Sequence, residues 1–204
     1  MLILVLDSCG SSCGVGVWQD GRVLVQMQER MERGQDARLM PMVVAALAQA
    51  GQGFTDIDRI AVTRGPGSFT GVRVGLAGAR GIGLAAAKPV IGIDRFAIYQ
   101  ALFTSADKNL LVVINSKRAE LFCQFFPAQG EAHEACMMTE EEIHAFVDAH
   151  PDTAIAGDIA TPDAQIFAVC AQLAAEAEAQ SPDFLPRPLY LRAPDVTFPV
   201  RKSL

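Results

Sequence analysis

The chain has 204 residues, of which 50% are hydrophobic and 20% are charged, and its formal net charge is −6. This apolar content excludes disorder as the main state, and no apolar run reaches the roughly 20 residues of a membrane-spanning helix. The five cysteines include no CxxC pair, so neither a disulfide framework nor a zinc site is predicted. We expect a cytoplasmic protein with no metal and no membrane partner.

Acidic residues are concentrated in the second half of the chain. Residues 119–186 hold 13 Asp or Glu and no Lys or Arg. Proteins that bind nucleic acid place clustered positive charge on the contact face. If the protein serves an RNA, we therefore expect this half not to contact the phosphates.

The first half predicts three strands followed by alternating helices and strands. An apolar run over residues 2–8 is typical of a strand buried on both faces. Valines with a period of two lie on either side of Asp20 and Gly21, a pair that favours a tight hairpin. The remaining predicted elements are a helix over 36–50 with Asp36 as its N-cap, a strand over 59–63, a helix over 69–88 and a strand over 90–93.

The second half repeats this order. Strands are predicted over 110–115, 120–126 and 135–138, and Thr139 with Glu142 opens a helix as a capping box. A strand over 153–156 and a helix that begins at Thr161 and Pro162 follow. Both halves predict the order β-β-β-α-β-α, which indicates a duplication and an α/β fold of mixed sheets with helices packed on them. We place the lobes at 1–103 and 104–204, with the second smaller, degenerate and ending in a proline-rich tail over the core.

The segment after the first predicted strand is rich in small residues. Asp7, Ser8, Gly10 and Ser11 form a turn whose backbone N–H groups suit an anion, and an aspartate here also suits a metal-bound water. The same residues fit a plain connection between two strands, and the segment has neither GxGxxG nor GK[ST]. Two interpretations stay open: a vestigial phosphate loop and, favoured, a simple hairpin.

A second glycine-rich segment separates a predicted strand from a predicted helix. Residues 64–73 read Arg-Gly-Pro-Gly-Ser-Phe-Thr-Gly-Val-Arg, with Ser68 or Thr70 available as the N-cap. Such a helix N-terminus favours anions, but no lysine follows the loop, so a nucleotide-binding P-loop is not supported. A rigid strand-to-helix turn explains the same residues.

The two helices predicted in the first half are unusual for a protein surface. The first has an apolar face and, beside it, a second apolar stripe of Met40, Val44 and Ala48. The second carries five glycines, each of which costs about 1 kcal/mol relative to alanine inside a helix. We interpret both as surface that a partner covers, and we expect a charge at Val43 or Leu47 to abolish the complex while the fold survives. The predicted partner-binding residues are Leu39, Met40, Met42, Val43, Leu47, Arg73, Gly75, Gly78 and Arg80.

The sequence contains few residues arranged for catalysis. The three histidines, His133, His144 and His150, are not spaced as a metal pair on one helix, and there is no GxSxG motif. Histidines in such an acidic, polar segment are typically solvated surface residues. We predict no catalytic residue and no metal site.

Several segments resemble the TsaB (YeaZ) family. They are the loop that contains Gly65, Pro66, Gly67, Ser68, Thr70 and Gly71, together with Asp7, residues 38–42, residues 90–93 and residues 188–192. The resemblance implies two related lobes of the RNase H-like, actin-like (ASKHA) fold. It also implies a non-catalytic subunit that binds and activates a TsaD-like threonylcarbamoyltransferase in the formation of N6-threonylcarbamoyladenosine in tRNA.

The resemblance also implies further partners. They are a TsaE-like ATPase and, only indirectly, tRNA. Separately from the resemblance, a pair of exposed helices can be self-complementary, so a second copy of the chain is a further candidate partner through the same helices. No cofactor is required by this chain, and ATP-Mg enters only at the level of the complex. The alternative is an ATP-binding ASKHA-type ATPase or kinase-like enzyme that uses Asp7 and the glycine-rich loops on ATP-Mg. Gly157 stands alone where such an enzyme would have a cluster of glycines.

Overall fold

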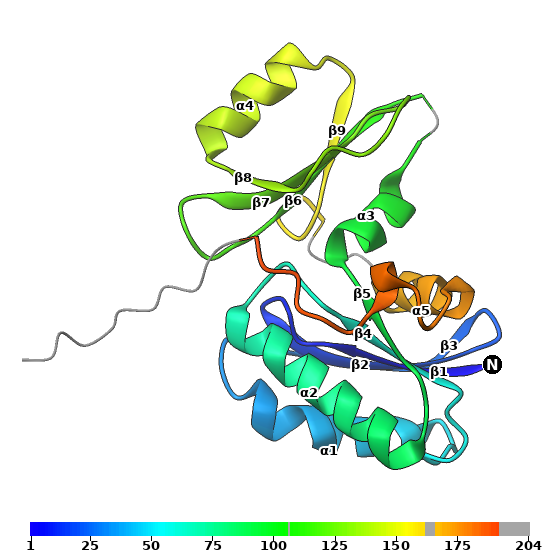
Figure 1. Cartoon of the computed structure of the whole chain (residues 1–204). Coiled ribbons are helices and arrows are strands. Elements are labelled where there is room, and N and C mark those ends of the chain that lie inside the picture. Colours follow the sequence, from blue (N-terminus) through cyan, green and yellow to red (C-terminus); the bar gives the residue numbers. More distant parts are fainter. Residues whose placement is uncertain (106, 162–165, 192–204) are drawn as a thin grey trace, which may run out of the picture.

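The computed structural model describes residues 1–105, 107–161 and 166–191. The chain forms two α/β lobes (Figure 1), as predicted. The elements of the first half are β1 (Leu2–Asp7), β2 (Ser12–Gln19), β3 (Arg22–Arg30), α1 (Gln35–Gln49), β4 (Arg59–Thr63), α2 (Phe69–Ala86), β5 (Val90–Ile93) and α3 (Arg95–Phe103). Those of the second half are β6 (Asn109–Ile114), β7 (Leu121–Phe126), β8 (Cys136–Met138), α4 (Glu140–Ala149), β9 (Thr153–Ala156), α5 (Ile166–Glu176) and the short 3-10 helix η1 (Pro182–Phe184). Among the helices of these described residues, none is both long and apolar enough to cross a lipid bilayer.

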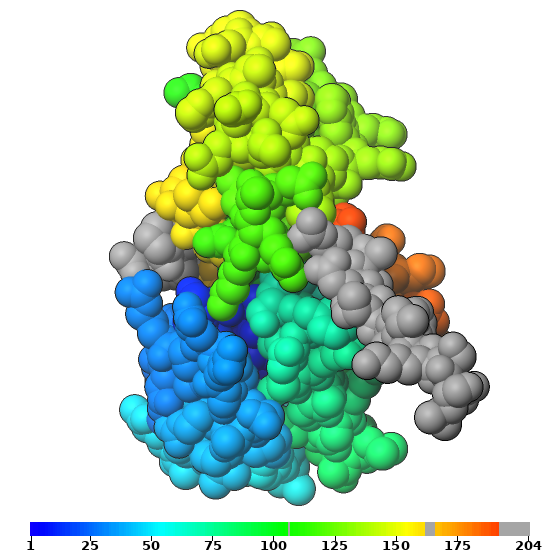
Figure 2. All heavy atoms as spheres, turned by 90° about the vertical axis from the view of Figure 1, so that its left-hand side faces the viewer, coloured from blue at the N-terminus to red at the C-terminus, as the bar shows by residue number. Residues whose placement is uncertain are grey.

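The two sheets have the same strand pattern. The first has the order β3-β2-β1-β4-β5 and the second β8-β7-β6-β9. In each, the first strand pairs antiparallel with the second and parallel with the fourth of that lobe. The predicted mixed sheets and the predicted repeat of element order are therefore confirmed. Figure 2 shows the lobes one above the other, the first in blue to teal and the second in green to yellow.

Local sequence signals explain most element boundaries. Asp20 and Gly21 both adopt positive φ, at 46° and 88°, as a two-residue hairpin turn requires. The capping box of Thr139 and Glu142 is present at the start of α4. One predicted cap is wrong: α1 begins at Gln35 after Gly34, whose φ of 91° turns the chain into the helix without a side-chain cap. Helix α3 was not predicted, because its nine residues include a buried arginine and give no clear amphipathic pattern.

Helix α5 packs on the first sheet, although it follows the second sheet in sequence. It contacts β1, β2, β4 and β5, and Figure 1 places it on the face of the first sheet opposite α1 and α2. Arg59 of β4 fixes its end, because the guanidinium donates to the carbonyl oxygens of Ala174 (2.8 Å) and Ala177 (2.7 Å). The predicted helix start at Pro162 lies outside the described residues. A division of the chain at 103/104 thus separates the two sheets, while α5 packs against the first.

Three apolar clusters form the core. One lies between the first sheet and helices α1 and α2, and another between the second sheet and α4. The third joins the opposite face of the first sheet to the second sheet through α3 and α5, and it includes Val5, Phe96, Val112 and Phe167. Because this cluster is continuous, the two lobes share one apolar core.

The described part of the predicted tail lies over the first lobe. Gly92 of β5 leaves room for the backbone of Leu185 and Pro186, since a Cβ atom there would meet Leu185 O at 2.6 Å. Further along, Leu189 N donates to Arg64 O at 2.8 Å. The segment 182–191 is therefore held by backbone contacts, while residues 192–204 lie outside the described part of the chain.

Candidate functional site

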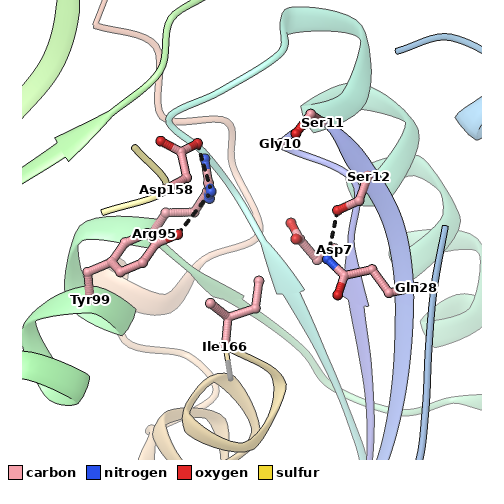
Figure 3. Close-up of a pocket in the computed structure, with 9 residues that line it drawn as sticks. All are labelled: Asp7, Gly10, Ser11, Ser12, Gln28, Arg95, Tyr99, Asp158 and Ile166. Carbon is pink, nitrogen blue, oxygen red and sulfur yellow. Dashed lines mark hydrogen bonds and ion pairs between the residues drawn. The ribbon is translucent and has the colours of Figure 1, made fainter. Parts of the chain in front are cut away.

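A small cleft lies between the lobes at the carboxyl end of β1, where a ligand is expected in open α/β sheets. Figure 3 shows its two sides: Arg95, Tyr99 and Asp158 face Asp7, Ser12 and Gln28 across it, and Ile166 forms the floor. Its volume is about 50 Å³, against the roughly 300–1,000 Å³ of common small-molecule sites. Gly10 and Ser11 complete the lining. As formed by the described residues, the cleft has room for water but not for a nucleotide.

Arg95 is the dominant charge of the cleft. Its side chain is only 4% exposed, and its guanidinium lies 3.3 Å from Asp158 Oδ2, 3.3 Å from Pro66 O and 3.5 Å from Tyr99 Oη. The remaining donor, Nε, is buried without a hydrogen-bond partner among the described atoms. Burial by itself would lower the pKa of Arg95, but the carboxylates of Asp158 and Asp7 outweigh it and raise the pKa. The guanidinium is therefore a permanent positive charge inside the cleft.

Asp7 ends β1 and is 2% exposed. Its Oδ1 accepts from the Thr63 hydroxyl at 2.6 Å and from the Cys9 N–H at 3.2 Å. The Cys9 thiol in turn lies 3.2 Å from Thr63 O and 3.0 Å from Thr63 Oγ1. Burial raises the pKa of this thiol to about 12, so Cys9 stays protonated and is a poor nucleophile at neutral pH.

The two glycine-rich segments of the sequence pack on each other. The Ser68 N–H donates to Cys9 O at 2.7 Å, and the Ser8 hydroxyl donates to Gly71 O at 2.7 Å. A side chain at Gly71 would overlap the Ser8 carbonyl oxygen, and one at Gly67 would overlap that of Cys9. Ser68 caps α2 through its side chain, as predicted. These glycines therefore serve backbone contact within the chain.

This packing bears on the predicted phosphate loop. At the start of α2, the Gly71 N–H donates to the Ser68 hydroxyl and the Ser68 N–H donates to Cys9 O, and Ser8 is fully buried. Only Gly10 and Ser11 of that loop have exposed surface in the cleft. The residues present therefore do not fit ATP-Mg: the space is too small, and a buried guanidinium already faces Asp7. The hairpin interpretation agrees with this geometry.

His133 and His144 are exposed, as predicted, whereas His150 is half-buried. His133 lies edge-on to Phe125 with ring centroids 5.0 Å apart, and His150 stacks on Phe146 at 4.1 Å. These rings belong to an aromatic cluster between β7 and α4, since Phe125 and Phe146 also touch. Among the described residues, no three His, Cys, Asp or Glu side chains are grouped as a metal ion requires.

The predicted partner-binding residues separate into buried and exposed sets. Leu39, Met42, Val43, Leu47 and Gly75 are buried in the core of the first lobe, so their placement on the helix surface is wrong. The four on α1 stand at positions i, i+3, i+4 and i+8, which is the helix face that packs on the sheet. The expectation that a charge at Val43 or Leu47 spares the fold is wrong for the same reason.

The second stripe is the one that stays exposed. Met40 is 40% exposed and Val44 54% exposed on α1, and Leu84 is 87% exposed on α2. Ala48 on α1 and Gly81 on α2 are also exposed. We call these residues the helix stripe: Met40, Val44, Ala48, Gly81 and Leu84.

Arg73 and Arg80 are exposed but contact the chain itself. The Arg73 guanidinium lies 3.7 Å from the centre of the Phe69 ring, and its Nε donates to Tyr190 Oη at 3.1 Å. Arg80 donates to Pro186 O. Gly78 faces Leu39 of α1. Partner binding by these residues stays a prediction.

The sequence analysis missed Arg95, Tyr99 and Asp158 as cleft residues. One signal pointed to Arg95: with Asp94 it follows β5, and the carboxyl ends of parallel strands share one edge of a sheet. The pairing with Asp158 joins residues 63 positions apart, and nothing local predicts it.

Comparison with known proteins gives consistent relatives. A family model described as "TsaD: tRNA N6-adenosine threonylcarbamoyltransferase" matches residues 29–143. The tRNA threonylcarbamoyladenosine biosynthesis protein TsaB of Escherichia coli is 43% identical over 46% of this chain and 40% of its own length. An uncharacterized protein of Mycobacterium tuberculosis is 33% identical over 95% of this chain and 92% of its own length. The crystal structure of YeaZ from Pseudomonas aeruginosa has a TM-score of 0.68 at 23% identity, covers 93% of this chain and 99% of its own, and shows the same fold.

The matches to named TsaB proteins are partial. The alignments span 40% of the Escherichia coli protein and 52% of the Haemophilus influenzae protein, so about half the length of these curated relatives is matched. The family model covers more than half of this chain, and the fold agrees over nearly all of it. The chain belongs to the family that the TsaD model describes, and named TsaB proteins are among its relatives.

Proposed function

We propose that this protein is a non-catalytic subunit that binds a TsaD-like threonylcarbamoyltransferase through the helix stripe and activates it in forming N6-threonylcarbamoyladenosine in tRNA. The pathway is suggested by the relatives named TsaB, which are biosynthesis proteins of this modified nucleoside. The observation that carries the proposal is the exposed apolar stripe on two neighbouring helices.

The helix stripe supports a protein partner. Leu84, at 87% exposure, is the most exposed large apolar side chain of the described residues, and Met40 and Val44 lie on the adjacent helix. Large apolar side chains exposed on neighbouring helices are a feature of interaction sites. Both helices pack on the same face of the first sheet, so a partner can contact them together (Figure 1).

Gly81 adds an independent argument. A Cβ atom on this residue would meet no atom of the described residues within 4 Å, so no contact among them requires glycine here. Glycine inside a helix costs about 1 kcal/mol relative to alanine. Glycine at this position would let the backbone of a partner helix approach closely, which explains why the less stable residue is present.

The cleft supports a non-catalytic role. The Cys9 thiol next to it is protonated, and the two glycine-rich loops contact each other. The Arg95 side chain occupies part of the small space that a nucleotide would need. The remaining parts of the proposal are a TsaE-like ATPase as a further partner, self-association through the same helices, only indirect contact with tRNA, and a cytoplasmic location.

The test is co-purification of the full chain with the TsaD-like subunit of the same cell. Val44→Glu combined with Leu84→Glu should abolish the complex and lower modified adenosine in tRNA, because two charges would be buried without partners. Ile155→Glu, at an exposed isoleucine of the second lobe, is the matched control and should leave the complex intact. A retained complex in the double variant would exclude the helix stripe as the interface.

A further inference from the structure

Arg95 joins three parts of the molecule that are far apart in sequence. Its backbone N–H donates to Gly65 O at 2.8 Å, and its side chain donates to Pro66 O at 3.3 Å, so the residue is fixed to the loop before α2 in the first lobe. The same side chain forms an ion pair with Asp158 at 3.3 Å. Asp158 belongs to the second lobe, because its Oδ1 accepts from the Asn115 N–H at the end of β6 at 2.8 Å.

The cleft also holds the carboxylate of Asp7, which is 2% exposed. A buried carboxylate is unstable unless a positive charge or several donors compensate for its lost hydration. Here the compensating cation comes from the chain itself, since Arg95 lies across the cleft from Asp7 (Figure 3). One guanidinium is therefore the positive charge that two acidic side chains from different lobes share, in addition to the Thr63 and Cys9 donors of Asp7 and the Asn115 donor of Asp158.

We propose that Arg95 is an internal countercharge that holds the two lobes at a fixed spacing, so that the cleft is closed without any bound metal or nucleotide. Its role is positional. The geometry supports it in three ways: the backbone anchor at Gly65, the bridge to Asp158, and the small volume left between the two sides. The inference concerns the isolated chain and does not depend on the proposed partner.

Gly157 strengthens the second end of this bridge. Its φ is +125°, and a side chain there would overlap the Val113 carbonyl oxygen of β6. Glycine at this position lets the chain turn sharply after β9 and brings Asp158 back over the end of β6. Asp158 is thus held to the second sheet by the close approach of Gly157 to Val113 and by the hydrogen bond from the Asn115 N–H.

The test is a double-mutant cycle on the full chain with Arg95→Met and Asp158→Asn. Arg95→Met removes the ion pair of Asp158 and the positive charge facing the buried Asp7, and it should reduce the equilibrium constant for folding roughly 100-fold or more at pH 7. Adding Asp158→Asn to Arg95→Met should recover a large part of this loss, because one uncompensated charge is removed. If the fold-change in the equilibrium constant of the double variant equals the product of the two single-variant fold-changes, Arg95 and Asp158 are not coupled and the proposal is overturned.

Lobe spacing is measured directly in the same variants. A nitroxide on the native exposed thiol Cys136 in the second lobe and another on Gln49→Cys in the first give a distance distribution by electron–electron double resonance. We expect a narrow distribution in the otherwise unchanged chain and a broader or longer one after Arg95→Met. Arg64→Met removes a largely buried arginine that pairs with Asp94 inside the first lobe, and it should leave the distance unchanged.

A variant that retains the arginine covers the case in which Arg95→Met fails to fold. Asp158→Asn alone removes the second-lobe end of the bridge, at a side chain that is 22% exposed. This variant should fold and should still broaden the distance distribution. An unchanged distribution in folded Asp158→Asn would overturn the proposal.

Discussion

Leu39 of α1 lies directly against Gly78 of α2: a Cβ atom on Gly78 would be 3.0 Å from Leu39 Cδ2. The glycine therefore allows the two helices to touch within one chain. With this contact, the buried face of α1 lies toward the sheet and toward α2, and Met40 and Val44 stay outside. The outward faces of the two helices are the surface on which the proposed function rests.

Gly78 and Gly81 should respond differently to alanine. Gly81→Ala meets only open space and should raise the free energy of unfolding by about 1 kcal/mol, the propensity difference between the two residues. Gly78→Ala gains the same propensity but presses on the buried Leu39 side chain, so it should stabilise less or destabilise. Urea unfolding of both variants measures the difference, and an equal gain in both would contradict the packing described.

Neighbouring valines of α1 provide a sharper contrast. Val43 is fully buried, so Val43→Glu should cost about 4 kcal/mol or more and unfold much of the protein, because it buries an unpaired charge. Val44 is 54% exposed, and Val44→Glu should change the free energy of unfolding by no more than about 0.5 kcal/mol. Circular dichroism with urea titration checks both. A folded Val43→Glu variant would mean that α1 is turned differently on the sheet.

The fold was largely predictable because its signals are local. The turn at Asp20 and Gly21, the cap at Ser68 and the capping box at Thr139 each act within a few residues. Helix periodicity indicated correctly that α1 has two apolar stripes. It could not indicate which stripe faces the sheet, since that depends on how the helix is rotated against distant strands.

The cleft was less predictable, because its contacts are long-range. Asp7 was recognised as the end of a buried strand, but its counterpart Arg95 follows β5 and pairs with a residue beyond β9. A buried arginine also runs against the usual expectation that such side chains are exposed. Likewise, the sequence indicated Gly67 and Gly71 as features of a helix start. In the structure they must be glycine because a Cβ atom at either would overlap a carbonyl oxygen of the loop after β1.

The buried thiol of Cys9 should make stability fall in alkaline solution. Burial raises its pKa from the ordinary 9.0 to about 12, so the folded thiol stays neutral where the unfolded one ionises. The stability is therefore complete below pH 9 and falls by up to about 1.4 kcal/mol per pH unit between pH 9 and pH 12. Urea unfolding between pH 8 and about pH 10.5 should show a shallower decline for Cys9→Ala than for the unchanged chain. Equal slopes would show that this thiol ionises alike in both states.

The isolated chain should not bind or hydrolyse ATP-Mg. The cleft of about 50 Å³ lacks room for a nucleotide, and the N–H groups of Ser68 and Gly71 at the start of α2 already donate to Cys9 O and the Ser68 hydroxyl. Isothermal titration of the full chain with ATP-Mg should give no binding heat, and a phosphate-release assay should give no turnover above buffer. Asp7→Asn is the matched variant, since it would abolish a metal-dependent activity while replacing the carboxylate by a side chain of the same shape. Tight binding that Asp7→Asn removes would instead support the ATPase or kinase-like alternative, because the cleft would then have to open for the nucleotide and expose that carboxylate.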